Sequence, residues 1–173
     1  SPNVKAVYDL IEGMPEGSKV LVSFDFDPAS KPELAPQGVA VLRHLFRKKH
    51  KVVGMGLWVT GVTLAKDIVA RTAKDANAKN GEDYVYLGWK PGNFAVIENM
   101  ATDIHGCFPK DNDGAETASI PLMKNLKKLA DFDLVVSLSA GDPGIETWIA
   151  YGSDKYHFKM TGGTTAVNVG SMA

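Results

Sequence analysis

The chain lacks several features that would narrow its function at once. It holds one cysteine, Cys107, among 173 residues, which excludes an internal disulfide and a metal site built on cysteine pairs. Its four histidines are scattered without metal-ligand spacing. Gly-x-Gly-x-x-Gly, Walker and Gly-x-Ser-x-Gly motifs are all absent. The sequence therefore carries none of the usual signatures of zinc, dinucleotide, P-loop or α/β-hydrolase sites.

An excess of charge and a long apolar run are also missing. The 19 Lys and Arg against 20 Asp and Glu give a formal net charge of -1, so there is no global attraction to nucleic acid or anionic lipid. We expect no nucleic-acid partner. The basic cluster 47–51 is interpreted as the complement of a helix dipole. No stretch approaches the length of a membrane span.

What is present indicates one globular domain. Hydrophobic residues make up 45% of the chain and charged residues 23%, an ordinary globular composition. The length fits one domain with a substantial core, and we predict a single domain over residues 1–173. The sequence starts and stops abruptly, so we expect this domain to be the soluble part of a longer, membrane-anchored protein.

The hydrophobic period switches back and forth along the chain. Short apolar runs predict strands at 19–26, 51–58, 83–89, 133–140 and 164–170. Helical spacing predicts helices over 32–49, over 61–78, from about Asn93 to Ile104, from Leu122 to Leu129, and after Asp142. Alternating strands and helices predict a three-layer α/β domain, Rossmann-like or flavodoxin-like, with a mostly parallel sheet covered by helices on both faces.

Polar side chains follow the predicted strands at their carboxyl ends, where open parallel sheets bind ligands. The candidate binding residues are Asp25, Asp27, Ser30, Thr60, Lys90, Asn93, Ser139 and Asp142. If the strands are parallel, all of them converge on one edge of the sheet. The sequence therefore predicts a polar site there that takes a small molecule or a partner protein.

Most of these residues also have a purely structural interpretation. Asp142, Asn93 and Thr60 are suited to cap helices. Lys90 belongs to a Lys-Pro-Gly sequence typical of a tight turn. Ser30 can serve as a turn hydroxyl before the next proline.

Asp25 and Asp27 are harder to explain in this way. Side chains two apart on a strand point to the same side, so both carboxylates would face one spot. They would repel each other unless Lys90 or a divalent cation such as Mg²⁺ lay between them. A metal site at Asp25 and Asp27 is therefore one interpretation, and a solvated turn at Asp27 before Pro28 is the other.

The Asp-x-Asp sequence of residues 25–27 resembles the first motif of the haloacid dehalogenase-like phosphatases. In that family the first Asp is the nucleophile and the second the general acid/base, and a hydroxyl residue, a lysine and acidic magnesium ligands follow. The resemblance implies an Mg²⁺-dependent phosphohydrolase, in which the matching residues are Asp25, Asp27, Thr60, Lys90 and Asp142. Two departures weaken it. PASKP (28–32) replaces the usual entry to a hairpin flap, and one acid follows the fourth strand instead of a pair.

Three segments, FDFDPASKPEL, YLGWKPGN and LSAGDPGIETWI, resemble an uncharacterised family of prokaryotic membrane-tethered α/β proteins with no assigned activity. This resemblance implies a Rossmann-like domain held at a membrane by a segment outside this chain, and it leaves open which side of the membrane the domain faces. It adds no chemistry, and it favours a binding, sensing or scaffolding module over an enzyme. An edge strand near either terminus would allow a homo-oligomer.

Overall fold

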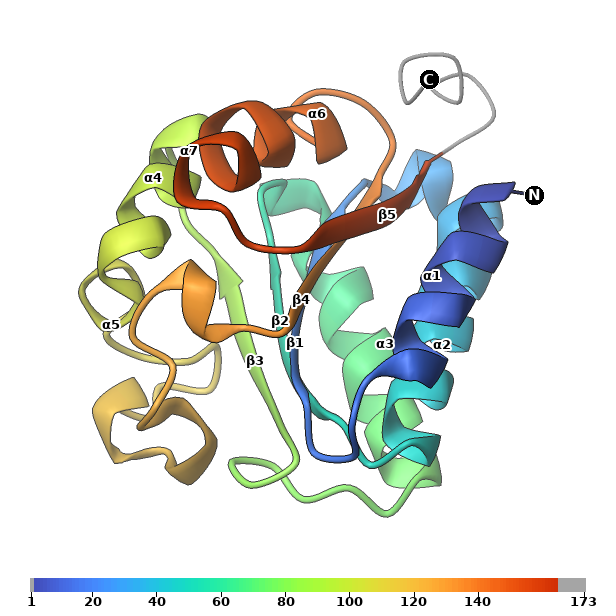
Figure 1. Ribbon diagram of the computed structural model, residues 1–173, viewed down its shortest axis with the longest axis horizontal. Helices are drawn as coiled ribbons and strands as arrows, with labels where there is room; N and C mark the ends of the chain where they lie inside the picture. The colour runs from blue at the N-terminus through green and yellow to red at the C-terminus, as the bar shows by residue number, and fades with distance from the viewer. Residues whose placement is uncertain (1, 165–173) are drawn as a thin grey trace.

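The computed structural model describes residues 2–164 and contains one five-stranded parallel sheet (Figure 1). Its strands are β1 (Lys19–Asp25), β2 (Lys51–Gly56), β3 (Tyr84–Trp89), β4 (Leu134–Ser139) and β5 (Met160–Thr164). They lie in the order β3-β2-β1-β4-β5, and all four pairings are parallel. The predicted parallel, Rossmann-like α/β fold is confirmed.

Helices cover both faces of the sheet, as Figure 1 shows. On one face lie α1 (Pro2–Gly13), α2 (Lys31–Arg47) and α3 (Val62–Asp75). On the other lie α4 (Phe94–Thr102), α5 (Ile104–Cys107), α6 (Ile145–Trp148) and α7 (Asp154–Tyr156). Each layer packs on its own buried apolar core, so the sheet separates two cores.

The strands divide their side chains between these two cores with a period of two. In β1, Val20, Val22 and Phe24 belong to the core under α2 and α3, and Leu21 belongs to the core under α4 and α6. Ser23 and Asp25 follow Leu21 in the same alternation, and both are fully buried. Two polar side chains of β1 therefore enter a largely apolar interior, where Ser137 and Ser139 of β4 are also buried.

Helix α1 was not predicted, although the sequence carries a signal for it. Val4, Val7, Tyr8 and Ile11 follow the i, i+3, i+4, i+7 spacing of one helical face. Val7 and Ile11 are buried in the core shared with α2, whereas Val4 and Tyr8 remain half-exposed. The helix lies against α2 and β5.

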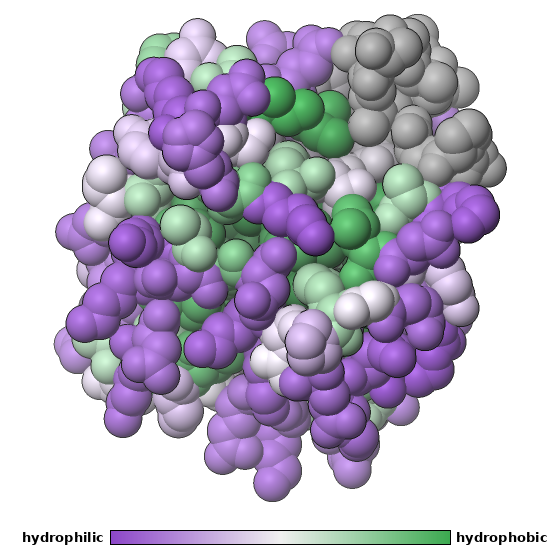
Figure 2. All heavy atoms as spheres, in the orientation of Figure 1, coloured by the Kyte–Doolittle hydropathy of each residue, from purple (hydrophilic) through white to green (hydrophobic). Residues whose placement is uncertain are grey.

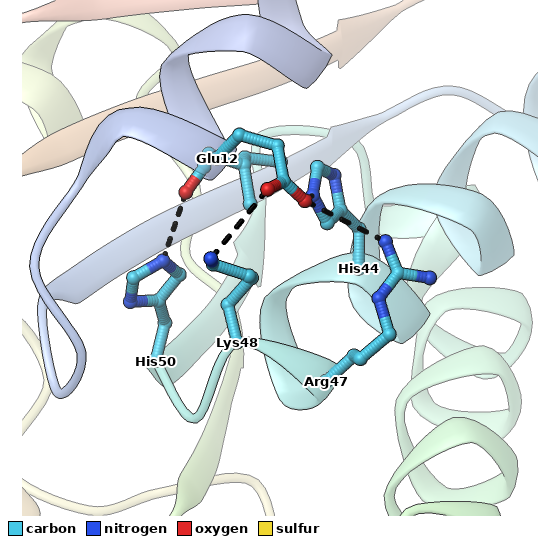
Figure 3. A network of polar contacts seen from close by, with 6 residues as sticks. Glu12, His44, Arg47, Lys48 and His50 are labelled. Carbon is cyan, nitrogen blue, oxygen red and sulfur yellow. Dashed lines mark hydrogen bonds and ion pairs between the residues drawn. The ribbon is translucent and has the colours of Figure 1, made fainter.

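A polar cluster fastens α1 to the end of α2 (Figure 3). The Glu12 carboxylate lies 2.6 Å from His44 Nε2, 3.7 Å from Arg47 and 3.5 Å from Lys48 Nζ. The His44 ring also stacks on Tyr8, with 4.5 Å between ring centroids. The hydrogen bond from His44 lowers the pKa of Glu12, and Lys48 lowers it further against the opposing effect of burial.

The prediction of a helix from Leu122 to Leu129 is wrong. This stretch forms 3₁₀ turns at Pro121–Met123 and Leu129–Asp131, although the apolar residues that suggested it are buried. His105 Nε2 donates to the carbonyls of Met123 and Leu126, and the Asp131 carboxylate accepts from the backbone of Lys127 and Lys128. These side chains bond backbone groups that helical hydrogen bonds would otherwise use.

The last strand begins earlier than predicted. The predicted strand 164–170 shares only Thr164 with β5, and the rest of that range lies outside the described residues. Within residues 2–164, no helix is both long enough and apolar enough to span a bilayer.

Candidate functional site

The candidate site is the C-terminal edge of the sheet, which comprises the segments that follow β1 to β4. Because β1, β2, β3 and β4 are parallel, their carboxyl ends share one edge, as predicted. The strand order reverses between β1 and β4, and ligands of open α/β sheets bind at such a switch point. Residues 26–30 and 140–144 border it.

Asp25 ends β1 at this point with no exposed surface. Its Oδ1 accepts from Ser23 Oγ at 2.6 Å and from the Leu57 backbone N–H at 2.9 Å. Its Oδ2 accepts from Ser137 Oγ at 2.7 Å and from Trp148 Nε1 at 3.0 Å. Burial raises the pKa of the Asp25 carboxyl, and the four hydrogen bonds oppose that shift.

This arrangement makes Asp25 a junction between elements. Its partners come from β1, the end of β2, β4 and α6, so one carboxylate ties three strands to the helix that follows the switch point. A carboxylate with both oxygens occupied and no exposed surface is not placed to attack a substrate or bind a metal. The geometry therefore does not support the catalytic and metal roles considered for Asp25.

The carboxylates of Asp25 and Asp27 do not face the same place, and within the described residues they have no hydrogen-bond partner in common. Strand β1 ends at Asp25, so the period-two argument does not extend to residue 27. Asp27 instead caps the 3₁₀ turn Pro28–Ser30, accepting at 3.3 Å from both the backbone N–H and the hydroxyl of Ser30. It is half-buried. The expectation of two facing carboxylates is wrong, and the turn interpretation of Asp27 is confirmed.

Lys90 does not bridge the two acids either. Its Nζ lies over the Phe108 ring, 5.8 Å from the ring centroid, a geometry suited to a cation–π contact. Lys90 is half-buried and follows β3. Lys90 is not among the hydrogen-bond partners of the Asp25 and Asp27 carboxylates.

The remaining candidates divide between capping and exposed positions. Thr60 and Asn93 are exposed, and neither side chain caps the helix that follows it. Asp142 is exposed and accepts from Thr147 Oγ1 at 3.1 Å, but Gly144 is the residue that precedes α6. Ser139 is buried, and its Oγ accepts from the Ile145 backbone N–H at 3.3 Å.

Trp58 and Trp148 also lie at the candidate site, although they are not among the candidate residues predicted from the sequence. Trp58 Nε1 donates to the Pro143 carbonyl at 2.6 Å, which joins the segments after β2 and β4 across the switch point. Ser23 and Ser137 could have revealed the Asp25 junction, because a serine two residues before Asp25 points to the same face. Ser137 on β4 is the register partner of Ser23.

Exposed apolar side chains gather in the same segments. Val59, Phe94 and Ile149, which follow β2, β3 and β4, are 55%, 45% and 38% exposed. Phe94 stacks on Tyr151 with 4.6 Å between ring centroids. A cavity of about 400 Å³ lies between α6 and β5, lined in part by Ile145, Ile149 and Met160. In Figure 2, apolar atoms reach the surface over this region between polar side chains.

No group of three or more His, Cys, Asp or Glu side chains within the described residues is arranged to hold a metal ion. No model of a known protein family matches the chain, and no curated protein does. Among solved structures, the chain is similar to the crystal structure of a universal stress protein in complex with cAMP. The identity is 12% over 87% of this chain and 100% of that one, with a TM-score of 0.45.

Proposed function

We propose that the chain is a binding domain rather than an enzyme, and that the C-terminal edge of its sheet is the recognition surface. One observation carries this proposal. Three of the five large hydrophobic side chains that are exposed in the described residues, Val59, Phe94 and Ile149, lie in the segments that follow β2, β3 and β4, whose carboxyl ends share this edge. Exposed apolar groups rimmed by polar residues mark interaction sites.

The polar rim supplies the groups that would orient a ligand. Thr60 adjoins Val59 and Asn93 adjoins Phe94, and both polar side chains are exposed. Asp142 adds a carboxylate after β4. A ligand with an apolar part and several hydrogen-bonding groups fits such a surface. We propose a small molecule of this kind, with a partner protein as the other ligand that the same surface could take.

A ligand screen by thermal unfolding tests this proposal. Metals including Mg²⁺, nucleotides and common metabolites are added separately, and a ligand that binds the folded state raises the melting temperature. We expect a ligand whose shift is lost in the double variant Val59→Ser/Phe94→Ser and kept in Tyr8→Ser, a similarly exposed control on α1. A shift that survives in the edge variant would contradict the site. An unmoved midpoint across the screen would rule against the small-molecule form and favour a partner protein.

The alternative function, an Mg²⁺-dependent phosphohydrolase, is tested with the same wild-type protein. The buried, fully bonded Asp25 gives no accessible nucleophile, so we expect no release of phosphate from an aryl phosphate in the presence of Mg²⁺. Turnover in the wild type that Asp25→Asn abolishes and Asp27→Ala reduces would overturn the binding-domain proposal. Membrane attachment and a homo-oligomer stay predictions, to be tested on the full-length sequence and by sedimentation.

A further inference from the structure

Two hollows flank helix α2 on the outer surface of the molecule, on the face of the sheet that α1, α2 and α3 cover. One, of about 440 Å³, lies between α1 and α2, and the other, of about 540 Å³, lies on the side of α2 that faces α3. Pro36 and Ala40 line both hollows. The exposed side of α2 is therefore a low ridge between two depressions, and we call this surface the α1–α2–α3 face.

The hollow between α1 and α2 has apolar walls and a deep apolar floor. Val4 and Tyr8, 54% and 50% exposed, form its α1 side. Leu138 of β4, only 1% exposed, lies at its bottom. These two α1 residues are the exposed large hydrophobics that the C-terminal edge does not account for. Their exposure is explained if another apolar surface packs against them.

The charges that line both hollows have one sign. Arg47 lines the first, and Lys31, Arg43 and Arg71 line the second, whereas no Asp or Glu is among the residues that line either hollow. Two of these arginines have carboxylate neighbours at long range, Arg43 at 3.8 Å from Asp75 and Arg47 at 3.7 Å from Glu12. Exposed ion pairs at such distances contribute little, so the arginines can bind a second carboxylate.

We propose that the α1–α2–α3 face docks an acidic amphipathic helix of a partner protein. Its apolar side chains would enter the two hollows on either side of Pro36 and Ala40, and its Asp and Glu residues would face the surrounding lysine and arginines. Helices pack with axes 8 to 10 Å apart, and helix-in-groove recognition uses apolar anchors at i, i+3, i+4 and i+7. A flat anionic bilayer would touch the rim but could not reach Leu138. This site is separate from the proposed recognition surface and does not depend on it.

Selection from a peptide library tests the proposal. The library holds 18-residue helical peptides with apolar residues at i, i+3, i+4 and i+7 and with Glu, Lys, Gln or Ser at the flanking positions. The wild type is the target, and affinities are measured by fluorescence anisotropy. We expect enriched peptides to be acidic, to lose at least tenfold in affinity for Ala40→Trp, and to keep their affinity for Ala70→Trp. Both alanines are exposed, so neither change disturbs a core.

A charge reversal gives a second readout. In Arg43→Glu/Arg71→Glu we expect acidic peptides to bind at least tenfold more weakly and their lysine analogues to bind more tightly, whereas Lys124→Glu/Lys127→Glu should change neither. Enrichment of basic peptides, or no peptide that distinguishes the wild type from Ala40→Trp, would overturn the proposal. It would also be overturned if Ala40→Trp dissociates an oligomer of this chain in sedimentation. Binding to phosphatidylglycerol vesicles that Ala40→Trp abolishes, with no peptide selected, would assign the face to a membrane instead.

Discussion

At the scale of single residues, Asp25 is the position where the chain depends most on one side chain. Each carboxylate oxygen accepts from one N–H group that can only donate, Leu57 N–H or Trp148 Nε1–H, and from one serine hydroxyl that can rotate. An amide has one oxygen and one NH₂ group, so it cannot accept from both N–H donors. Asparagine has nearly the same shape as aspartate, but at this position it would leave one of the two N–H donors without an acceptor.

We predict that Asp25→Asn lowers the free energy of unfolding by about 1–3 kcal/mol, because it leaves a buried N–H donor without an acceptor. Urea denaturation measures the change. Asp27→Asn is the matched control, because asparagine caps a turn about as well as aspartate and Asp27 is only half-buried. Equal stability losses in the two variants would contradict the junction role of Asp25.

The raised pKa of Asp25 predicts a pH dependence with a definite sign. Burial makes the folded state hold the proton more tightly than the unfolded chain, whose carboxyl has the ordinary value of 3.8. Between that value and the raised folded pKa, the folded state binds more protons, so stability falls as the pH rises. We predict that the difference in unfolding free energy between wild type and Asp25→Asn shrinks over this range, as measured by urea denaturation at successive pH values. A difference that grows with pH would contradict the raised pKa.

At the scale of elements, Glu12 joins α1 to α2. Its lowered pKa predicts a pH dependence of stability opposite in sign to that of Asp25. The hydrogen bond from His44 lowers the pKa of Glu12 below its ordinary 4.5, so its stabilising effect is complete above that value and is lost as the pH falls through the folded pKa. We predict that Glu12→Gln lowers the melting temperature at neutral pH and that the difference from wild type narrows below pH 4.5. A difference that stays constant into acid would exclude this role.

The segments after β2 and β4 are joined by Trp58, which gives a second prediction at this scale. Trp58→Phe keeps a ring in place but removes the 2.6 Å hydrogen bond to the Pro143 carbonyl, and we expect a loss of about 0.5–1.5 kcal/mol. Amide hydrogen exchange should quicken in residues 140–148. Trp89→Phe is the control, because Trp89 Nε1 donates to Leu57 at the same edge and not to the β4 segment. Equal exchange in both variants would show that Trp58 does not hold this segment.

At the scale of the whole molecule, the sequence predicted the sheet and four of its strands because buried parallel strands read as short apolar runs bounded by turns. It placed β5 too late because the glycines at 162 and 163 hid a strand pattern. By topology alone it also predicted that the segments after β1 to β4 share one edge of the sheet, as they do. It could not show that Asp25 is buried, because the donors at Leu57, Ser137 and Trp148 meet it only after β1, β2, β4 and α6 assemble.

Two cores on opposite faces of one sheet raise the question of whether the molecule unfolds as one unit. Ile11 is 1% exposed in the core under α1 and α2, whereas Trp148 belongs to the core on the other face. β1 contributes Val22 to the first core and Leu21 to the second, so loss of either core must disturb the strand that both share. The cores should therefore melt together.

We predict that Ile11→Ala lowers the free energy of unfolding by about 2–5 kcal/mol and lowers the thermal midpoint equally by tryptophan fluorescence and by far-ultraviolet circular dichroism. Fluorescence includes Trp148 on the far face, whereas circular dichroism includes α1, α2 and α3. Val4→Ala, at a position 54% exposed, should change stability by no more than about 0.5 kcal/mol. If Ile11→Ala shifts the circular dichroism midpoint and leaves the fluorescence midpoint unmoved, the two faces unfold separately and the single-domain prediction is wrong. Coincident shifts would show that the shared strands couple a change in α1 to the residues that hold the candidate site.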